Sequence, residues 1–432
     1  MDIEGIKRII TDQRYEIDHL YKNRRLIERD LPEDKLVQSL EHPNILAVLG
    51  VRRCGKSVCS HMLLKEKEYG YINFDDERLY GIDAAALNLV LQAFYELYST
   101  ELEYFMLDEI QNVPGWELFA NRLRRTKKVV LTGSNAKLLS GELATHLTGR
   151  YLDVILYPFS FCEFLKFKEI EPDIYSTRSI ARIKNALKEY IDVGGFPEVY
   201  IFQKEMAARI YEDIIYKDII FRHDIRNKRS FSQIAKYLVS NFSCEFSYKK
   251  LCGVTSIRNV HTVKDYIGYL ESSYIILVVE RFSFKLKEQM MAPRKVYCID
   301  TGMINTIAFR SSQDMGRLME NLVAVELHRR KSYYGGDDVF YWKDHQQREV
   351  DFVLKRGRKV SELIQVSYAS GEEGIKNREF KGLLRAAVEL GCDNMKVITW
   401  DYEGDVGDVK CVPLWKWLLA DFRLDVDSLV IG

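Results

Sequence analysis

The sequence has few of the residues that mark flexible linkers, and it has no tract of low complexity. Only 8 of its 432 residues are proline, and no Ser/Gly-rich or Gln-rich segment interrupts it. With 47% hydrophobic and 29% charged residues, the chain has enough apolar material for ordinary cores. Its length exceeds the size at which a single core stops growing. We therefore expect two or three domains that abut closely.

Cysteine and histidine are present, but their spacing does not indicate a metal site or a disulfide framework. The eight cysteines contain no C-x-x-C pair, and the eight histidines form no H-E-x-x-H pattern. Zinc sites and small disulfide-stapled domains usually show such spacings. The sequence therefore gives no reason to expect either.

The sequence also lacks an excess of charge of either sign, and it lacks a long apolar run. Lys+Arg and Asp+Glu both number 63, so any binding to nucleic acid must come from a local patch. No stretch approaches the roughly 18 uninterrupted apolar residues of a membrane span, and the N-terminal M-D-I-E-G has no apolar core. We expect a cytoplasmic protein with no membrane partner.

A phosphate-binding loop is the most informative feature that is present. Residues 50–57 read G-V-R-R-C-G-K-S, after the apolar run 45–49 and before a predicted helix at 58–64. In such loops the glycines let backbone N–H groups point at phosphates, the lysine reaches the β- and γ-phosphates, and the serine ligates Mg²⁺. The predicted nucleotide-binding residues are Gly50, Arg52, Arg53, Cys54, Gly55, Lys56, Ser57 and Val58.

Two alternatives bear on this loop. A glycine turn with a chance Lys-Ser would give the same letters, but the strand before it and the helix after it favour nucleotide binding. Cys54 is either a small residue that fits the loop or a thiol whose oxidation affects nucleotide binding. We favour the first interpretation for Cys54.

Short apolar runs with helical segments between them predict a parallel α/β sheet. The runs are 71–74, 104–107, 129–131 and 151–156. The second run ends in Asp108 and Glu109, which places both carboxylates at the edge of the sheet where ligands bind. This pattern is typical of a Walker B segment, although an acidic pair can also simply end a strand.

The two carboxylates are assigned different roles. Asp108 is expected to hold Mg²⁺ together with Ser57, and Glu109 to orient and polarise the attacking water. A glutamate directly after the metal-binding aspartate favours a hydrolase over a GTPase with a distant glutamine.

Two further polar positions follow later strands. Ser134 and Asn135 follow the run 129–131, where they could contact the γ-phosphate or the water, or form a simple turn and helix N-cap. Arg150 precedes the run 151–156 and is either an arginine finger, in its own chain or a neighbour's, or part of a surface salt bridge.

These motifs together carry a family resemblance. The sequence contains G-V-R-R-C-G-K-S, Y-I-N-F-D-D, Y-F-M-L-D-E-I-Q, L-T-G-S-N-A-K-L-L-S and L-T-G-R-Y followed by Y-P-F-S-F-C-E-F. Over essentially the whole chain it resembles the prokaryotic AAA-type ATPases that carry a C-terminal domain of unknown function. The resemblance implies ATP as the nucleotide. It assigns Arg52 and Arg53 to the loop signature, Asp108, Glu109 and Gln111 to Walker B, Ser134 and Asn135 to a sensor, and Arg150 to a Gly-Arg motif.

The middle of the chain predicts a winged helix-turn-helix. Helices are expected at 231–238, 248–252 and 259–270, followed by a strand at 275–279, while V-G-G-F-P-E at 193–198 is expected to join two helices. The third helix would occupy the recognition position on DNA. The residues that could face a DNA groove are Ser256, Arg258, Asn259, His261, Thr262 and Lys264.

A winged helix can equally serve as a protein-protein module, and the charge along the third helix is modest. A basic strip just beyond it favours DNA, although its alternation with phenylalanines also fits a strand with one solvated face. The strip comprises Arg281, Lys285, Lys287, Arg294 and Lys295. DNA and a protein are both retained as partners of this region.

The C-terminal segment predicts a helix at 319–327 and paired strands at 349–354 and 363–367. Glu320, Asp351 and Gln365 would then stand as the acids do in a PD-(D/E)xK nuclease core, where they hold a metal ion. Ser367 occupies the position of the water-activating lysine. Unless Lys355 or Lys359 lies close to these residues, no side chain is available to activate the attacking water. We therefore expect a degenerate nuclease-like lobe.

The expected fold class is α/β, with a P-loop parallel-sheet domain, a helical and winged-helix region, and a small α/β nuclease-like domain. The expected parts are an N-terminal helical segment at 1–40, the ATPase domain at 41–170, the winged-helix region at 171–300 and the nuclease-like domain at 301–432. The predicted function is a Mg²⁺-dependent ATP-hydrolysing switch that acts on DNA or a protein partner. The alternatives are an ATP-regulated DNA endonuclease and a nucleotide-dependent interaction module without nucleic acid. The sequence does not indicate the oligomeric state.

Overall fold

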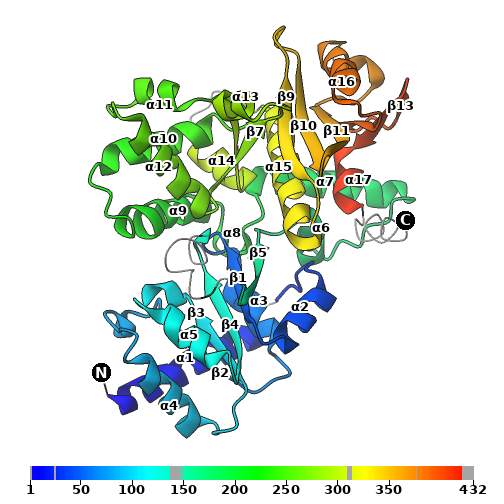
Figure 1. Ribbon diagram of the computed structural model, residues 1–432. Helices are drawn as coiled ribbons and strands as arrows, with labels where there is room; N and C mark the ends of the chain where they lie inside the picture. Colours follow the sequence, from blue (N-terminus) through cyan, green and yellow to red (C-terminus); the bar gives the residue numbers. More distant parts are fainter. Residues whose placement is uncertain are drawn as a thin grey trace. The chain divides into compact units, whose positions relative to one another are not determined.

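The computed structural model describes residues 2–23, 26–136, 147, 149–308, 314–375 and 377–420. The chain divides into two compact units, Met1–Tyr157 and Pro158–Gly432. Each unit has its own sheet (Figure 1). The structure confirms the expected α/β class, with a parallel sheet first and helical and further α/β regions after it.

The first unit is built on a five-stranded sheet with the strand order β2-β3-β4-β1-β5, in which all neighbours are parallel. The strands are β1 (Ile45–Gly50), β2 (Tyr69–Asn73), β3 (Tyr104–Asp108), β4 (Lys128–Gly133) and β5 (Tyr151–Leu156). All six residues of β1 and all five of β3 are buried. A parallel strand is covered on both faces, which is why these strands read as continuous apolar runs.

The helices of this unit are α1 (Ile3–Asn23), α2 (Glu33–Glu41), α3 (Lys56–Leu63), α4 (Leu87–Leu97) and α5 (Trp116–Leu123), with short 3-10 turns η1 (Glu77–Leu79) and η2 (Ile110–Asn112). Helix α1 buries Ile6, Ile9, Ile10 and Ile17, one helical face, and it packs against α4 and β2. The predicted N-terminal helical segment therefore belongs to the same unit as the parallel sheet.

The second unit begins with helices and ends in a nine-stranded mixed sheet of order β13-β14-β12-β11-β10-β9-β7-β8-β6. Its helices are α6 (Phe161–Phe167), α7 (Thr177–Val193), α8 (Pro197–Phe202), α9 (Met206–Asp213), the π-helix η5 (Ile214–Phe221), α10 (Lys228–Ser240), α11 (Tyr248–Val254), α12 (Val260–Ser272), α13 (Leu286–Met291), α14 (Thr301–Ile307), α15 (Met315–Tyr334), the 3-10 turn η6 (Glu372–Gly374), α16 (Asn377–Leu390) and α17 (Leu414–Leu419). Its strands are β6 (Cys244–Phe246), β7 (Ile276–Arg281), β8 (Arg294–Cys298), β9 (Asp338–Lys343), β10 (Glu349–Arg356), β11 (Lys359–Ser367), β12 (Met395–Thr399), β13 (Gly404–Val406) and β14 (Val409–Pro413).

This sheet contains strands from two parts of the chain that we expected to be separate, the winged-helix region and the nuclease-like domain. Strands β6, β8 and β7 come from the predicted winged-helix region, and β7 pairs in parallel with β9, with Glu280 opposite Phe340. The expected boundary at 300/301 therefore lies inside one continuous sheet. The division between the two compact units lies at 157/158, earlier than the expected boundary at 170/171.

The segment V-G-G-F-P-E joins α7 to α8, as expected, and a buried aspartate explains the first of its two glycines. The carboxylate of Asp300 accepts hydrogen bonds from the N–H groups of Gly195 (2.6 Å) and Met303 (2.9 Å). Gly194 has φ +89°, and a Cβ there would lie 2.1 Å from Asp300 Oδ1. Burial raises the pKa of Asp300 to about 6. The motif therefore docks a helix joint onto the N-cap of α14.

Over the ranges that the structure describes, we find no helix whose length and apolar character suit a membrane crossing.

Candidate functional site

The phosphate-binding loop connects β1 to α3, and two glycines give it its shape. Gly50 has φ +145°, and a Cβ there would lie 2.1 Å from the carbonyl oxygen of Leu156 on β5. Gly55 has φ +98° and precedes the first residue of α3 in a left-handed conformation. L-residues rarely adopt either conformation. The backbone therefore turns back over the start of α3, where the N–H groups of a helix attract anions.

Lys56 lies between this loop and the second Walker B carboxylate. Its side chain is buried, and its Nζ donates to the carbonyl oxygen of Val51 at 3.2 Å and pairs with Glu109 Oε1 at 3.5 Å. An ammonium held in this way is placed to exchange Glu109 for phosphate oxygens when a triphosphate binds. The structure therefore brings together the loop lysine and the predicted water-orienting glutamate.

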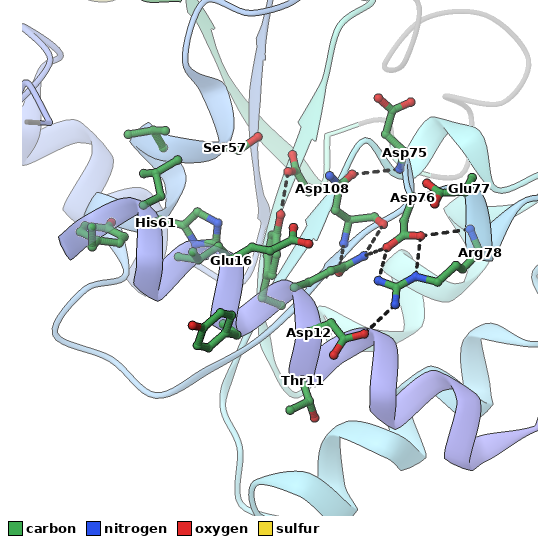
Figure 2. Close-up of a pocket in the computed structure, with 18 residues that line it drawn as sticks. Thr11, Asp12, Glu16, Ser57, His61, Asp75, Asp76, Glu77, Arg78 and Asp108 are labelled. Atoms are coloured by element: carbon green, nitrogen blue, oxygen red, sulfur yellow. Dashed lines mark hydrogen bonds and ion pairs between the residues drawn. The ribbon is translucent and has the colours of Figure 1, made fainter. Parts of the chain in front are cut away.

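Asp108 ends β3 as a buried carboxylate with two hydroxyl partners. It accepts hydrogen bonds from Thr132 and from the Tyr71 hydroxyl at 3.2 Å, and Figure 2 shows the Ser57 side chain beside it. Burial raises its pKa, and the charge of Glu109 raises it further, while the hydroxyl groups of Thr132 and Ser57 lower it. A nearby cation would favour the ionised form. Because a hydroxyl and a carboxylate are oxygen ligands of the kind Mg²⁺ prefers, Ser57 and Asp108 fit the predicted metal site.

Glu109 is held in an uncommon backbone conformation. Its φ of 50° and ψ of 41° are left-handed, which costs a residue other than glycine on the order of 1 kcal/mol or more. Its N–H donates to Thr132 Oγ1 at 3.0 Å, and the amide of Gln111 donates to its carboxylate. These two bonds hold the side chain, which is only 12% exposed, close to Lys56.

Thr132 and Tyr71 are site residues that the sequence reasoning missed. Thr132 bonds both Walker B residues, and Tyr71 bonds Asp108. The sequence showed only that Tyr71 begins the apolar run 71–74 and that Thr132 follows the run 129–131. The strand order that places both beside the strand of Asp108 comes from the tertiary structure. Ser134 and Asn135 follow β4 and are buried. Within the described ranges the Ser134 hydroxyl has no hydrogen-bond partner. The sensor role of Ser134 and Asn135 stays a prediction.

Ser57 and Asp108 also line an open pocket of about 1080 Å³, whose other lining residues come largely from α1, α3, β2 and the segment after β2. Figure 2 shows the acidic side chains around it, together with Arg78, which pairs with two of them. The acidic side chains are Asp12, Glu16, Asp75, Asp76, Glu77 and Asp108. Gln13 anchors α1 by donating to the carbonyl oxygen of Asn73 (3.1 Å) and to Asp76 (2.9 Å). The predicted metal-binding pair, Ser57 and Asp108, therefore faces a space lined by acidic side chains.

The remaining loop residues have different surroundings. Arg52 pairs with Asp75 at 2.8 Å, whereas Arg53 is exposed with φ 64°. The thiol of Cys54 is fully buried and donates to the carbonyl oxygen of Leu156 at 3.3 Å, and burial raises its pKa. These facts favour the interpretation of Cys54 as a packing residue, which leaves its backbone to contact a nucleotide. Val58 lies in the first turn of α3.

Arg150 directly precedes β5 and so lies at the amino-terminal ends of the parallel strands, whereas the phosphate-binding loop lies at their carboxyl ends. Its carbonyl oxygen accepts from Ile45 N at 3.0 Å, and the register pairs Ile45 with Tyr151 but Gly50 with Leu156. The five steps of β1 between Ile45 and Gly50 correspond to about 17 Å. This separation favours a neighbour's site over the nucleotide of the same chain. The finger role of Arg150, in its own chain or a neighbour's, stays a prediction.

The second unit gathers the three predicted nuclease-like residues and adds one that was assigned elsewhere. The Gln365 amide donates to Asp351 Oδ2 at 2.6 Å. Lys295 Nζ lies 2.8 Å from Glu320 Oε1 and 3.1 Å from Asp351 Oδ1. The placement of Lys295 in an exposed basic strip was wrong, because its side chain is only 2% exposed. The available signal was the buried apolar run Val296, Tyr297 and Cys298, which directly follows Lys295 on β8.

Neither of the two lysines that were considered for the role of the missing base reaches this cluster. Lys355 faces Val360 across the β10–β11 hairpin, beside the turn, and Lys359 opposes Arg356 there. Lys355 is four residues from Asp351 along β10, which corresponds to about 13 Å. The predicted hairpin itself is confirmed, since β10 and β11 pair antiparallel.

Comparisons with known proteins agree with the nucleotide site and give no activity for the second unit. Residues 42–165 match the model of an AAA domain, which confirms a P-loop domain of the AAA-like ATPase type. Residues 184–314 and 315–417 match two domains of unknown function, DUF8612 and DUF4143.

Two relatives resemble the chain along most of its length. The uncharacterized protein MJ1544 of Methanocaldococcus jannaschii is 36% identical over 424 residues, which cover 92% of each chain. An uncharacterized protein of Haemophilus influenzae is 28% identical over 424 residues, covering 92% of this chain and all of that protein. Among solved structures, the Walker-type ATPase paby2304 of Pyrococcus abyssi has 16% identity and a TM-score of 0.44, covering 65% of this chain and 96% of that chain. A likeness this distant carries no argument here.

Proposed function

This chain belongs to the family of the Methanocaldococcus jannaschii protein MJ1544, and we propose that its P-loop domain hydrolyses ATP with Mg²⁺. We propose further that the bound nucleotide controls how the second unit binds DNA. The observation that carries the hydrolysis proposal is the set of four side chains at one edge of the parallel sheet. Lys56 pairs with Glu109, and Ser57 lies beside Asp108 on the same pocket (Figure 2). These are the groups that phosphoryl transfer to water requires.

The proposed reaction divides the work among these residues. The loop N–H groups and Lys56 bind the phosphates of ATP, and Ser57 and Asp108 hold Mg²⁺. Mg²⁺, when bound, neutralises charge on the phosphate oxygens. Glu109 accepts a hydrogen bond from the attacking water and aligns it with the γ-phosphorus. Gln111 and Thr132 keep Glu109 in position through the two bonds described above.

The test is release of phosphate from ATP by the full chain, with and without Mg²⁺. Hydrolysis should require Mg²⁺ and stop when EDTA removes it. Competition between ATP and GTP for binding tests the choice of base, which rests on the family resemblance. A chain that binds ATP with Mg²⁺ but releases no phosphate would contradict the hydrolysis proposal.

The contacts of Arg29 support the proposal that nucleotide state reaches the second unit. Its guanidinium donates to the carbonyl oxygen of Cys54 in the loop (2.9 Å) and to that of Tyr157 (2.6 Å), the last residue of the first unit. On the other side of this boundary, Arg329 donates to the carbonyl oxygen of Pro158 at 3.0 Å. A shift of the loop on ATP binding would therefore act on the segment where the chain leaves the first unit.

DNA as the partner is supported by the order and exposure of elements in the second unit. Helices α10, α11 and α12 precede the antiparallel pair β7–β8, with β6 beside β8, an order typical of winged helices. Arg258, His261 and Lys264 are exposed. Asn259 caps α12 by accepting from His261 N–H at 2.9 Å, so it is less free for a base contact than was expected.

We predict that the double variant Arg258→Ala/Lys264→Ala binds duplex DNA more weakly than wild type. Loss of two phosphate contacts should reduce the dependence of log affinity on log salt by about 2. The measurement is a salt series of duplex binding in the presence of ATP and of ADP, and the two nucleotides should give different affinities. Lys188→Ala/Lys381→Ala removes two exposed lysines outside this region and should bind like wild type. Equal salt dependence in both double variants would contradict the DNA proposal.

A second prediction concerns Arg150 and a neighbouring subunit. If it completes a neighbour's site, Arg150→Ala should lower turnover and leave ATP affinity nearly unchanged. Mixing Arg150→Ala with Lys56→Ala should then restore part of the activity, because a mixed assembly pairs one intact loop with one intact arginine. The measurement is the ATPase rate of each variant alone and of the mixture. Absence of recovery would remove the finger role.

A nucleotide-dependent protein module remains the second candidate, because one observation favours it. The segment around α13 exposes four large apolar side chains: Phe284, Leu286, Met290 and Met291 are 72%, 69%, 61% and 79% exposed. Apolar groups gathered on a surface often mark a protein contact. If duplex DNA does not bind at any salt concentration, this candidate replaces DNA as the partner.

A further inference from the structure

We infer that the ammonium group of Lys295 is a built-in cation that takes the place of a divalent metal ion in the nuclease-like lobe. The Lys295 cluster comprises Lys295, Tyr297, Glu320, Glu349, Asp351 and Gln365, and it lies inside the second unit. The inference does not depend on the ATPase proposal, because none of these residues belongs to the nucleotide site.

The geometry gives the ammonium three acidic partners. Lys295 Nζ lies 2.8 Å from Glu320 Oε1, 2.5 Å from Glu349 Oε1 and 3.1 Å from Asp351 Oδ1. These partners come from α15 and β10, whereas Lys295 comes from β8. An ammonium has three N–H donors and no acceptor, so its hydrogen-bonding capacity matches the three carboxylates around it.

Other protein donors also contact the oxygens of the cluster. The Tyr297 hydroxyl donates to Glu320 Oε1 at 2.8 Å, the same oxygen that Lys295 contacts. Asp351 Oδ2 accepts from the Gln365 amide at 2.6 Å and from Val366 N–H at 3.0 Å. Glu349 Oε2 also pairs with Lys343 at 3.5 Å. The protein itself therefore orients these side chains, and Lys295 and Lys343 offset part of their negative charge.

A divalent metal ion does not fit this arrangement. Mg²⁺ needs near-octahedral oxygen ligands at about 2.0–2.1 Å, some of them water, but the Lys295 side chain is only 2% exposed and occupies the centre of the carboxylates. Across the described ranges, no group of three or more His, Cys, Asp or Glu side chains is arranged to hold a metal ion. Metal-assisted cleavage also needs a metal-polarised water, which an ammonium does not supply.

The first experiment removes the ammonium and keeps the length of the side chain. In an Asp108→Asn background, which weakens the nucleotide-site metal, Mn²⁺ binding to nucleotide-free protein is followed by electron paramagnetic resonance. Lys295→Met should gain a Mn²⁺ site at least about tenfold tighter than any in the parent chain, because three carboxylates lose their cation. Adding Asp351→Asn should abolish the new site. The matched control Lys343→Met, which removes a lysine that pairs with Glu245 and Glu349 but leaves Lys295 in place, should gain none.

The second experiment uses the wild-type cluster and stands if Lys295→Met fails to fold. The Asp108→Asn chain and the double variant Asp108→Asn/Asp351→Asn should bind Mn²⁺ equally. Supercoiled plasmid incubated with ATP and Mg²⁺ or Mn²⁺ should be nicked no more by wild type than by Asp351→Ala. A folded Lys295→Met chain without a new Mn²⁺ site would overturn the inference. So would Mn²⁺ binding or nicking by the wild-type cluster that depends on Asp351.

Discussion

Glu109→Gln is expected to slow ATP hydrolysis by about 100- to 10,000-fold, the usual range for loss of a positioned general base. The amide keeps the shape of the side chain but accepts a proton far more weakly from the attacking water. ATP should bind at least as tightly as before. In the structure the Glu109 carboxylate pairs with Lys56 at 3.5 Å, so the carboxylate competes with the phosphates for that ammonium, and the amide competes less.

The measurement is single-turnover phosphate release, together with ATP affinity from equilibrium titration. The matched control is Glu77→Gln, which neutralises an exposed carboxylate of the same cavity and should hydrolyse ATP at the wild-type rate. Hydrolysis by Glu109→Gln at the wild-type rate would show that the role assigned to Glu109 is wrong. Loss of ATP binding in Glu109→Gln would instead indicate that the carboxylate shapes the loop.

Lys56→Ala should weaken ATP binding by roughly 100-fold or more, since hydrogen bonds to charged groups contribute about 1.5–3 kcal/mol each. Two effects add to that loss. The ammonium no longer contacts the β- and γ-phosphates, and the carboxylate of Glu109, only 12% exposed, is left facing the triphosphate without its partner. Like charges at this distance in a partly buried site repel strongly.

The measurement is ATP affinity by equilibrium titration, with unfolding temperature as a check on folding. Lys65→Ala provides the control, because Lys65 is exposed just beyond the end of α3 and its loss should not change affinity. ATP affinity of Lys56→Ala within a few fold of wild type would remove the loop from its proposed role. It would also contradict the proposal that Lys56 exchanges Glu109 for phosphate oxygens when ATP binds.

The sequence by itself determined the parts of this protein that depend on short stretches of chain. The loop at 50–57 was predictable because glycines, a lysine and a serine must follow one another at fixed spacing to surround phosphates. The parallel sheet was predictable because its buried strands read as continuous apolar runs. Asp108 and Glu109 could be placed at its edge because they directly follow such a run. The β10–β11 hairpin was predictable for the same local reason.

Only the tertiary structure decided the features that join residues far apart in the sequence. Glu320 and Asp351 meet Lys295, which is 25 and 56 residues away from them, and the sequence alone suggested an exposed strip for that lysine. Arg150 followed a familiar motif, but the pairing of β5 with β1 places it at the edge away from the loop. The pairing of β7 with β9 in one sheet could not be predicted from the sequence either. Local patterns set backbone conformation and which face is apolar, whereas the partner of a buried charge is set by how whole elements pack.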